Sequence, residues 1–183
     1  MKADNQKPWI LAGYELFAKE GPQALKVEVI SRIVQKSKSS FYHHFADLEV
    51  FTELLLSHHL QQARILADKE RACERVVPDL LHILVAHKQD LLFNRQLRFN
   101  REVPAFRSCF EQVNAEVGTA IVDIWAESLG LEERSHLALL VLNLSMENFF
   151  LQITEESLNY EWLEAYIKEI RFMVSQFQNS PTT

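Results

Sequence analysis

Residues 37–45, SKSSFYHHF, concentrate side chains that can donate hydrogen bonds. The stretch contains three serines, a lysine, a tyrosine and two histidines, and it contains no carboxylate. Such a set suits a negatively charged partner with many acceptor oxygens, such as a phosphate backbone. Two other interpretations are a metal site built on His43 and His44, and the plain polar surface of a short helix.

The spacing of the histidines argues against a metal site. His43 and His44 are adjacent, as are His58 and His59, and adjacent residues on a helix point about 100° apart. A zinc site needs three or four converging ligands, and the only two cysteines form no CxxC pair. We therefore expect no metal and no cofactor.

A short helix over residues 38–45 would orient the donors. Ser37 is placed to accept a hydrogen bond from an early backbone N–H of that helix. Phe41 and Phe45 lie four positions apart, so they are expected to face inward together. The outward residues are then Ser39, Ser40, Tyr42 and His43.

The residues before this helix predict a second short helix and a tight turn. Helical spacing fits 27–34, with a break at 35–37. The residues expected to face inward are Val29, Ile30, Ile33 and Val34. Two short helices joined by a tight turn form a helix-turn-helix, whose second helix enters the major groove of DNA.

Helical spacing continues along the rest of the chain, which has only four glycines and no strand pattern. We expect a first helix from Pro8 to Gly21 and a long helix from Leu48, capped by Asp47. Later helices are expected at 79–94, 105–129, 132–157 and 161–178, with a further short helix near 95–102. The predicted fold is all-α: a three-helix head over 1–47, joined by a long helix to a helical bundle within 48–183.

The charge distribution is uneven. The net charge is −6, which argues against a protein that coats nucleic acid indiscriminately. Residues 1–63 carry seven Lys/Arg and seven Asp/Glu, so the acidic excess lies in the later part. Residues 29–46 contain Arg32, Lys36 and Lys38 and no acid. A local basic patch therefore persists on an acidic protein.

Several classes of protein are disfavoured. No apolar run approaches the ~20 residues of a membrane span, and the first residues have no apolar signal region. We expect a cytoplasmic protein that does not associate with membranes. No phosphate-binding glycine loop, HExxH motif or nucleophile elbow is present, so we do not expect an enzyme.

The motifs ILAGYELFAKEG over residues 10–21 and VEVISRIVQKSKSSFYHHFADLEVF over residues 27–51 resemble the DNA-binding domain of TetR-type transcriptional regulators. The resemblance covers roughly residues 8–60. It implies an all-helical homodimer with a helix-turn-helix domain over 1–47 and a domain over 48–183 for effector binding and dimerisation. It also implies a ligand-responsive repressor that reads a palindromic operator in double-stranded DNA.

Carried over by position, the resemblance places a set of residues at the DNA. These are Lys26, Lys36, Ser37, Lys38, Ser39, Ser40, Tyr42, His43 and His44. Several positions depart from the family pattern, and three of them matter most: Gln35 replaces a common glycine, Leu25 a hydroxyl residue and Leu48 a lysine. They support an alternative function, a TetR-fold ligand-binding or interaction protein with weakened DNA recognition.

The segment 87–110 interleaves aromatic residues with arginines, namely Arg95, Arg98, Arg101 and Arg107. One interpretation is an apolar pocket with a cationic rim for a small amphipathic anion as effector. The other is a core helix whose arginines pair with acidic helices. The candidate ligand-binding residues are Phe93, Arg98, Phe99, Phe106, Phe110, Trp125 and Phe149.

The last two expected helices carry more apolar surface than one face of a small bundle needs. Pairing with the same helices of a second chain would bury that surface in a four-helix bundle. The alternative is burial within one chain.

Overall fold

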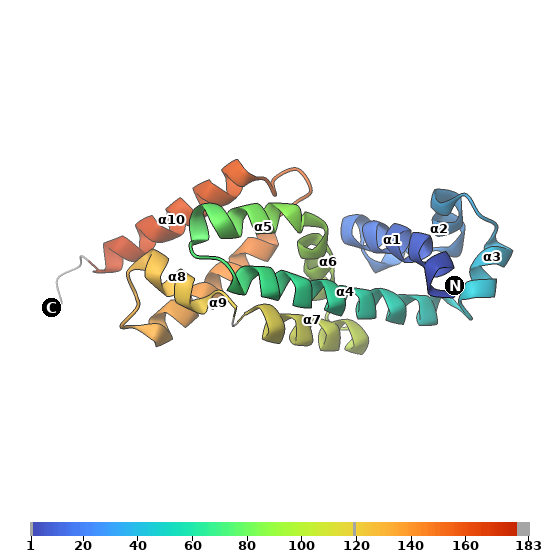
Figure 1. Ribbon diagram of the computed structural model, residues 1–183, viewed down its shortest axis with the longest axis horizontal. Coiled ribbons are helices and arrows are strands. Elements are labelled where there is room, and N and C mark those ends of the chain that lie inside the picture. The colour runs from blue at the N-terminus through green and yellow to red at the C-terminus, as the bar shows by residue number, and fades with distance from the viewer. Residues whose placement is uncertain (1, 119, 179–183) are drawn as a thin grey trace. The chain divides into compact units, whose positions relative to one another are not determined.

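The structure is a computed structural model that describes residues 2–118 and 120–178 (Figure 1). In this part of the chain every regular element is helical, which confirms the predicted all-α fold. The first helices are α1 (Lys2–Glu20), η1 (Pro22–Ala24), α2 (Val27–Val34), α3 (Lys38–His44), α4 (Leu48–Arg71) and η2 (Val76–Leu80). They are followed by α5 (Leu81–Ala86), α6 (Lys88–Phe99), α7 (Pro104–Val117), α8 (Val122–Leu129), α9 (Ser135–Gln152) and α10 (Tyr160–Gln178).

The chain divides into two compact units. Unit 1 comprises Met1–Arg64 and Gln89–Asn114, and unit 2 comprises Ile65–Lys88 and Ala115–Thr183. The long helix α4 contributes to both units. The boundary at residue 47, which separates a DNA-reading head from an effector domain, is a division by function and stays a prediction.

Helix α1 begins at Lys2, six residues before the expected start at Pro8. A proline inside a helix removes one backbone donor but does not always end the helix. The side-chain amide of Gln6 donates to the carbonyl oxygen of His44 at 3.0 Å, which attaches the early part of α1 to the end of α3.

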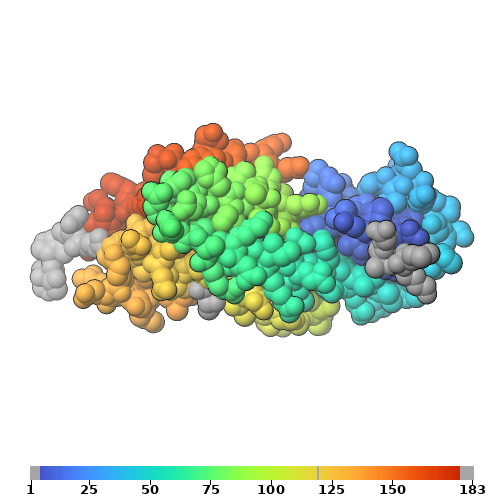
Figure 2. Space-filling model, in the orientation of Figure 1, coloured from blue at the N-terminus to red at the C-terminus, as the bar shows by residue number. Residues whose placement is uncertain are grey.

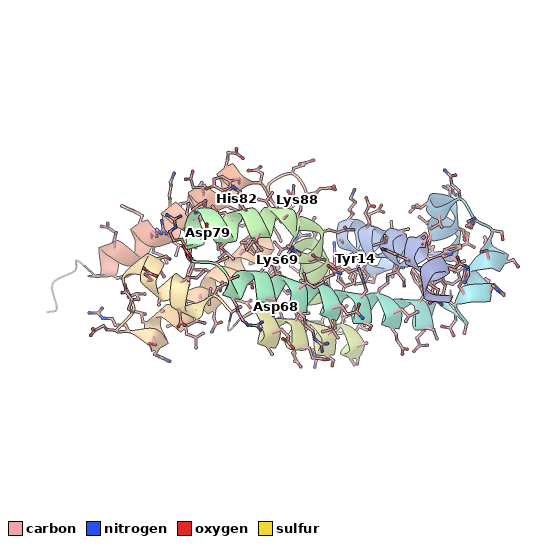
Figure 3. The ribbon with its side chains drawn as sticks, in the orientation of Figure 1. Tyr14, Asp68, Lys69, Asp79, His82 and Lys88 are labelled. Carbon is pink, nitrogen blue, oxygen red and sulfur yellow. The ribbon has the colours of Figure 1, made fainter. Side chains whose placement is uncertain are left out.

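The expected helix over 79–94 is interrupted at His87, between α5 and α6. The backbone at His87 leaves the helical region, with φ −102° and ψ 23°. The imidazole Nε2 lies 2.8 Å from Nζ of Lys69, which is labelled in Figure 3. Most of the expected helix over 95–102 belongs to α6, which ends at Phe99.

Two later helices also differ from expectation. The span 105–129 contains two helices, α7 and α8, and α9 ends at Gln152 instead of residue 157. A side-chain turn follows α9: Thr154 N donates to Ser157 Oγ at 2.8 Å, and Ser157 N donates to Thr154 Oγ1 at 3.0 Å. These local bonds offer the backbone an alternative to continued helix.

An aromatic cluster holds the helices of the head together. Trp9 of α1 lies edge-on to Phe41 of α3, with ring centroids 5.6 Å apart. Phe45 packs on Phe51 of α4 at 4.9 Å, and all four rings are buried. Because these rings come from α1, α4 and the segment of α3 with its C-cap, the orientation of α3 is fixed by packing on α1 and α4.

A second cluster in unit 1 combines aromatic stacking with a polar network. Phe93 of α6 stacks on Tyr14 and Phe17 of α1, at 4.3 Å and 4.1 Å between centroids. The Tyr14 hydroxyl, labelled in Figure 3, donates to Asp90 Oδ1 at 2.7 Å and lies 2.7 Å from Nδ1 of His59 in α4. Tyr14 and His59 are buried.

Unit 2 contains an acidic side chain in its interior. Glu70 of α4 is 2% exposed, and its Oε2 has no hydrogen-bond partner. Burial raises the pKa of this carboxyl to about 8, and the charge of Arg71 offsets part of that rise. Glu70 is therefore mostly protonated at neutral pH.

Among the described residues, no helix is both long and apolar enough to cross a membrane.

Candidate functional site

The turn between α2 and α3 has a defined hydrogen-bonded geometry. Lys36 N donates to Ser31 O at 2.9 Å, and Gln35 N donates to Arg32 O at 3.2 Å. This pair of bonds is a Schellman motif, which requires a left-handed residue after the helix. Gln35 occupies that position with φ 56° and ψ 43°. The turn is thus formed without the glycine that is common there, at the expense of local strain.

Helix α3 begins as the sequence predicts. The Ser37 hydroxyl accepts a hydrogen bond from Ser40 N at 3.1 Å, and Ser37 is the N-cap. Phe41 and Phe45 are 0% and 2% exposed, which confirms that they face inward together. Asp47 Oδ1 likewise accepts from Val50 N at 2.8 Å and caps α4.

Most of the predicted DNA-contacting side chains are exposed in unit 1. Figure 2 shows atoms of α2 and α3, in light blue, at the surface of the molecule. The exposed members of the set are Lys26, Lys36, Ser37, Lys38, Ser39, Tyr42 and His43, while Ser40 and His44 are half-buried. Helix α3 and its flanks therefore present ammonium, hydroxyl and imidazole groups together.

One of the four residues of α2 that are predicted to face inward is exposed, so that prediction is wrong. Ile30 is fully buried and Val29 and Val34 are partly buried, but Ile33 is 51% exposed. The inward stripe is completed instead by Val27 and by Ser31, a polar residue that apolar periodicity does not identify.

An acid lies beside the donors of α3. Glu28 of α2 accepts a hydrogen bond from Lys38 Nζ, and this contact lowers the pKa of the Glu28 carboxyl. Glu28 immediately precedes the acid-free stretch 29–46, so the composition of that stretch does not include it. The signal that could have found it is its position in the first turn of the helix that packs against α3.

Two of the departures from the family pattern serve packing. Leu25 is 5% exposed and belongs to the core of unit 1, and Leu48 is half-buried at the start of α4. Lys26 is the N-cap of α2 and makes no side-chain capping bond. The backbone N–H groups at that end of α2 are therefore not capped by the side chain of Lys26.

The candidate ligand-binding residues are divided between the two units. Phe93, Arg98, Phe99, Phe106 and Phe110 belong to unit 1, whereas Trp125 and Phe149 belong to unit 2. Phe93 stacks on α1, and Phe106 lies edge-on to Phe17 at 5.5 Å, so both rings contribute to core packing.

One surface hollow does lie in the segment where a ligand was predicted. It has a volume of about 300 Å³ and is lined by Arg101, Arg107, Phe110 and Glu111. The Arg98 guanidinium lies over the Phe110 ring at 5.6 Å from its centroid. Phe110 is the only predicted ligand residue among the four that line it.

Comparison with known proteins identifies the fold but no sequence relative. No family model matches the chain, and no curated protein matches it. The chain is similar to the solved structure of a TetR-family regulator from Rhodococcus sp., with 15% identity and a TM-score of 0.55 over 95% of this chain and 98% of that one. It is also similar to a TetR-family regulator from Mesorhizobium loti, with 15% identity and a TM-score of 0.51 over 94% of this chain and 98% of that one. A third similar structure is Salmonella enterica GusR, with 14% identity and a TM-score of 0.57 over 97% of this chain and 96% of that one.

These similarities extend over almost the full length of each chain, at sequence identities that establish only the fold. The chain therefore has the fold of the TetR-family transcriptional regulators.

Proposed function

We propose that this protein is a DNA-binding transcriptional regulator whose helix α3 reads the major groove. The observation that carries the proposal is the exposed, donor-rich surface of α3, held by an intact α2–α3 turn. Lys36 and Lys38 supply charge for phosphates, and Tyr42, 56% exposed, supplies a hydroxyl. Ser39 and His43 are suited to base edges in the groove.

The proposed regulator acts as a homodimer through α9 and α10. Support comes from apolar side chains that remain exposed in the single chain. On α9, four of them lie at spacings of three, four and seven residues, on one face: Leu137, Leu140, Leu144 and Leu151, while the exposed Leu139 lies off that face. On α10 they are Phe172, Met173 and Phe177. Covering them with a second copy would remove this apolar surface from water.

A symmetric dimer reads a palindrome whose half-sites lie about one or more helical turns apart, ~34 Å per turn. We extend the proposal to a ligand-responsive repressor, in which an effector changes the operator affinity. The similarity to TetR-family regulators supports this extension.

One observation favours a second candidate, a protein of this fold with weakened DNA recognition. The Glu28 carboxylate lies within hydrogen-bonding contact of Lys38 and adds negative charge next to the proposed phosphate contacts. The two candidates differ in one property, because only the first requires specific, salt-dependent DNA binding.

The test is selection of bound fragments from random duplex DNA by the full chain at moderate salt. We expect a recovered inverted repeat that binds less tightly as salt rises. Lys38→Ala and Tyr42→Ala should lower the affinity, and Lys38→Ala should also reduce the salt slope by about 0.9. Arg71→Ala is the matched control, since Arg71 is an exposed cation paired with Asp68 outside the helix-turn-helix.

Two results would refute the proposal. One is the absence of any enriched duplex whose binding depends on salt. The other is unchanged affinity of both α3 variants for an enriched duplex, which would place the DNA contact elsewhere on the chain.

A further inference from the structure

The surface hollow at the corner between α6 and α7 is lined by more positive than negative side chains. Arg101 and Arg107 line the hollow, and in the described part of the chain neither forms an ion pair with a carboxylate. Arg107 is nevertheless held in place, because its Nε donates to the carbonyl oxygen of Arg101 at 2.9 Å. This contact leaves the two terminal nitrogens of Arg107 for another acceptor.

Arg98 increases the positive potential at the same place. It lies three residues before Arg101, is 9% exposed, and places its guanidinium over the Phe110 ring. Burial and the charge of Arg101 both lower the pKa of Arg98, which reflects its separation from water and a like charge nearby. An anion in the hollow would relieve this repulsion.

The hollow also has an apolar wall. Phe110 is half-buried and lines it, so one ring face can accept an apolar group. A volume of about 300 Å³ is at the lower end of the range for small-molecule sites. The lining therefore combines two arginine side chains with one aromatic surface.

Glu111 restricts the charge of a ligand that fits. It is the one acid of the lining and forms no ion pair with Arg107, which precedes it by one helical turn. A second negative charge on a ligand would meet this carboxylate. The lining therefore favours a monoanion over a dianion such as a phosphate monoester.

We propose that the hollow between Arg101, Arg107, Phe110 and Glu111 binds a monocarboxylate with an aromatic or acyl body. The carboxylate accepts hydrogen bonds from Arg107 and Arg101, and the apolar body lies against Phe110. This inference deepens the proposed function, because it gives the effector a chemical class and a location. Ligand binding is measured without DNA, so either proposal can fail without the other.

The test is a fluorescence titration of the full chain with 1-naphthoate, with 1-naphthalenemethanol as the neutral analogue. Arg101→Gln and Arg107→Gln should each weaken 1-naphthoate binding about ten-fold, as expected for loss of a hydrogen bond to a charged group. Glu111→Gln should strengthen it, because it removes the only negative charge of the lining. Arg71→Gln, an exposed arginine outside the hollow, is the control.

Thermal melts of each variant establish that the fold is retained, which is expected because Arg101, Arg107 and Glu111 are exposed. Three results would overturn the proposal: no binding of 1-naphthoate, equal binding of the neutral analogue, or equal binding by the two arginine variants and the wild type. The last result would place the ligand in another part of the chain.

Discussion

The hydroxyl of Tyr14 lies 2.7 Å from Nδ1 of the buried His59, and the same hydroxyl donates to Asp90. A phenol has a single proton, so an oxygen that donates to Asp90 must accept from His59. The hydrogen of the neutral imidazole is therefore on Nδ1. Burial, the largest influence on His59, lowers its pKa to about 4, so the ring is neutral at neutral pH.

Acid is expected to weaken the fold through His59. As pH falls from 6.5 to about 4, an unfolded histidine gains a proton that the folded protein excludes, so the free energy of unfolding decreases. The gap between these pKa values corresponds to about 3 kcal/mol. Urea unfolding across this range should show the loss in the wild type and in the exposed control His43→Gln. An equal loss in His59→Gln would contradict the prediction.

Glu70 should have the opposite pH dependence. Its folded pKa of about 8 exceeds the ordinary 4.5, so the free energy of unfolding decreases as pH rises from 4.5 to 8. Glu70→Gln mimics the protonated side chain and is expected to raise stability by about 3 kcal/mol at pH 7, with little change at pH 4.5. Glu74→Gln, at an exposed acid nearby, is the control. A pH-independent effect of Glu70→Gln would show that ionisation is not the cause.

Gln35→Gly is expected to stabilise the head. The left-handed backbone at Gln35 disfavours residues with a Cβ, whereas glycine adopts it freely. After the greater flexibility of glycine in the unfolded chain is included, a gain of about 0.5–1 kcal/mol remains. Chemical unfolding measures it. Gln35→Ala retains the Cβ and should show no comparable gain in stability. An equal gain in Gln35→Ala would contradict backbone strain as the cause.

Glu28→Gln should increase DNA affinity. The substitution removes a negative charge from the proposed DNA surface, beside Lys38. Repulsion between Glu28 and the phosphates is screened by salt, so the gain in affinity should be largest at low salt. Fluorescence anisotropy with the selected duplex at several salt concentrations measures both effects, and Asp68→Asn is the matched control. Weaker binding by Glu28→Gln would instead indicate that Glu28 positions Lys38 for contact.

Leu144→Glu is expected to yield a monomer. Leu144 is 62% exposed at the centre of the apolar face of α9, and a carboxylate there would lose solvation in a dimer. Sedimentation equilibrium measures the change in mass, and circular dichroism should show an unchanged helix content. Leu11→Glu, at a leucine 47% exposed on α1, should leave the mass unaltered. A dimer that persists in Leu144→Glu would place the interface on another surface.

Local rules were sufficient for the caps of α3 and α4 and for the inward residues of α3, but not for Ile33 of α2. The capping roles of Ser37 and Asp47, and the inward pair Phe41 and Phe45, depend on residues within four positions of one another. Apolar spacing could not locate the break at His87, because the pattern continues across it from α5 into α6.

Contacts between distant residues could not be predicted from spacing. Tyr14 meets His59 and Asp90, which lie 45 and 76 positions away along the chain. Such contacts depend on how α1, α4 and α6 pack. The exposed residues of α3 could be predicted from local helical geometry. The hollow could not, because it depends on Glu111 and on the turn between α6 and α7.

The stacking of Phe93 on Tyr14 and Phe17 has a mechanical consequence. Both stacked rings belong to α1, so α6 and α1 resist sliding past one another. Arg98, beside the hollow, is on the same helix as Phe93, five residues further along. A ligand that displaced the end of α6 would therefore push on the helix that carries Trp9, the ring against which Phe41 of α3 is braced. The helix that carries Arg98 and the helix that carries Phe41 are thus joined through aromatic contacts with α1.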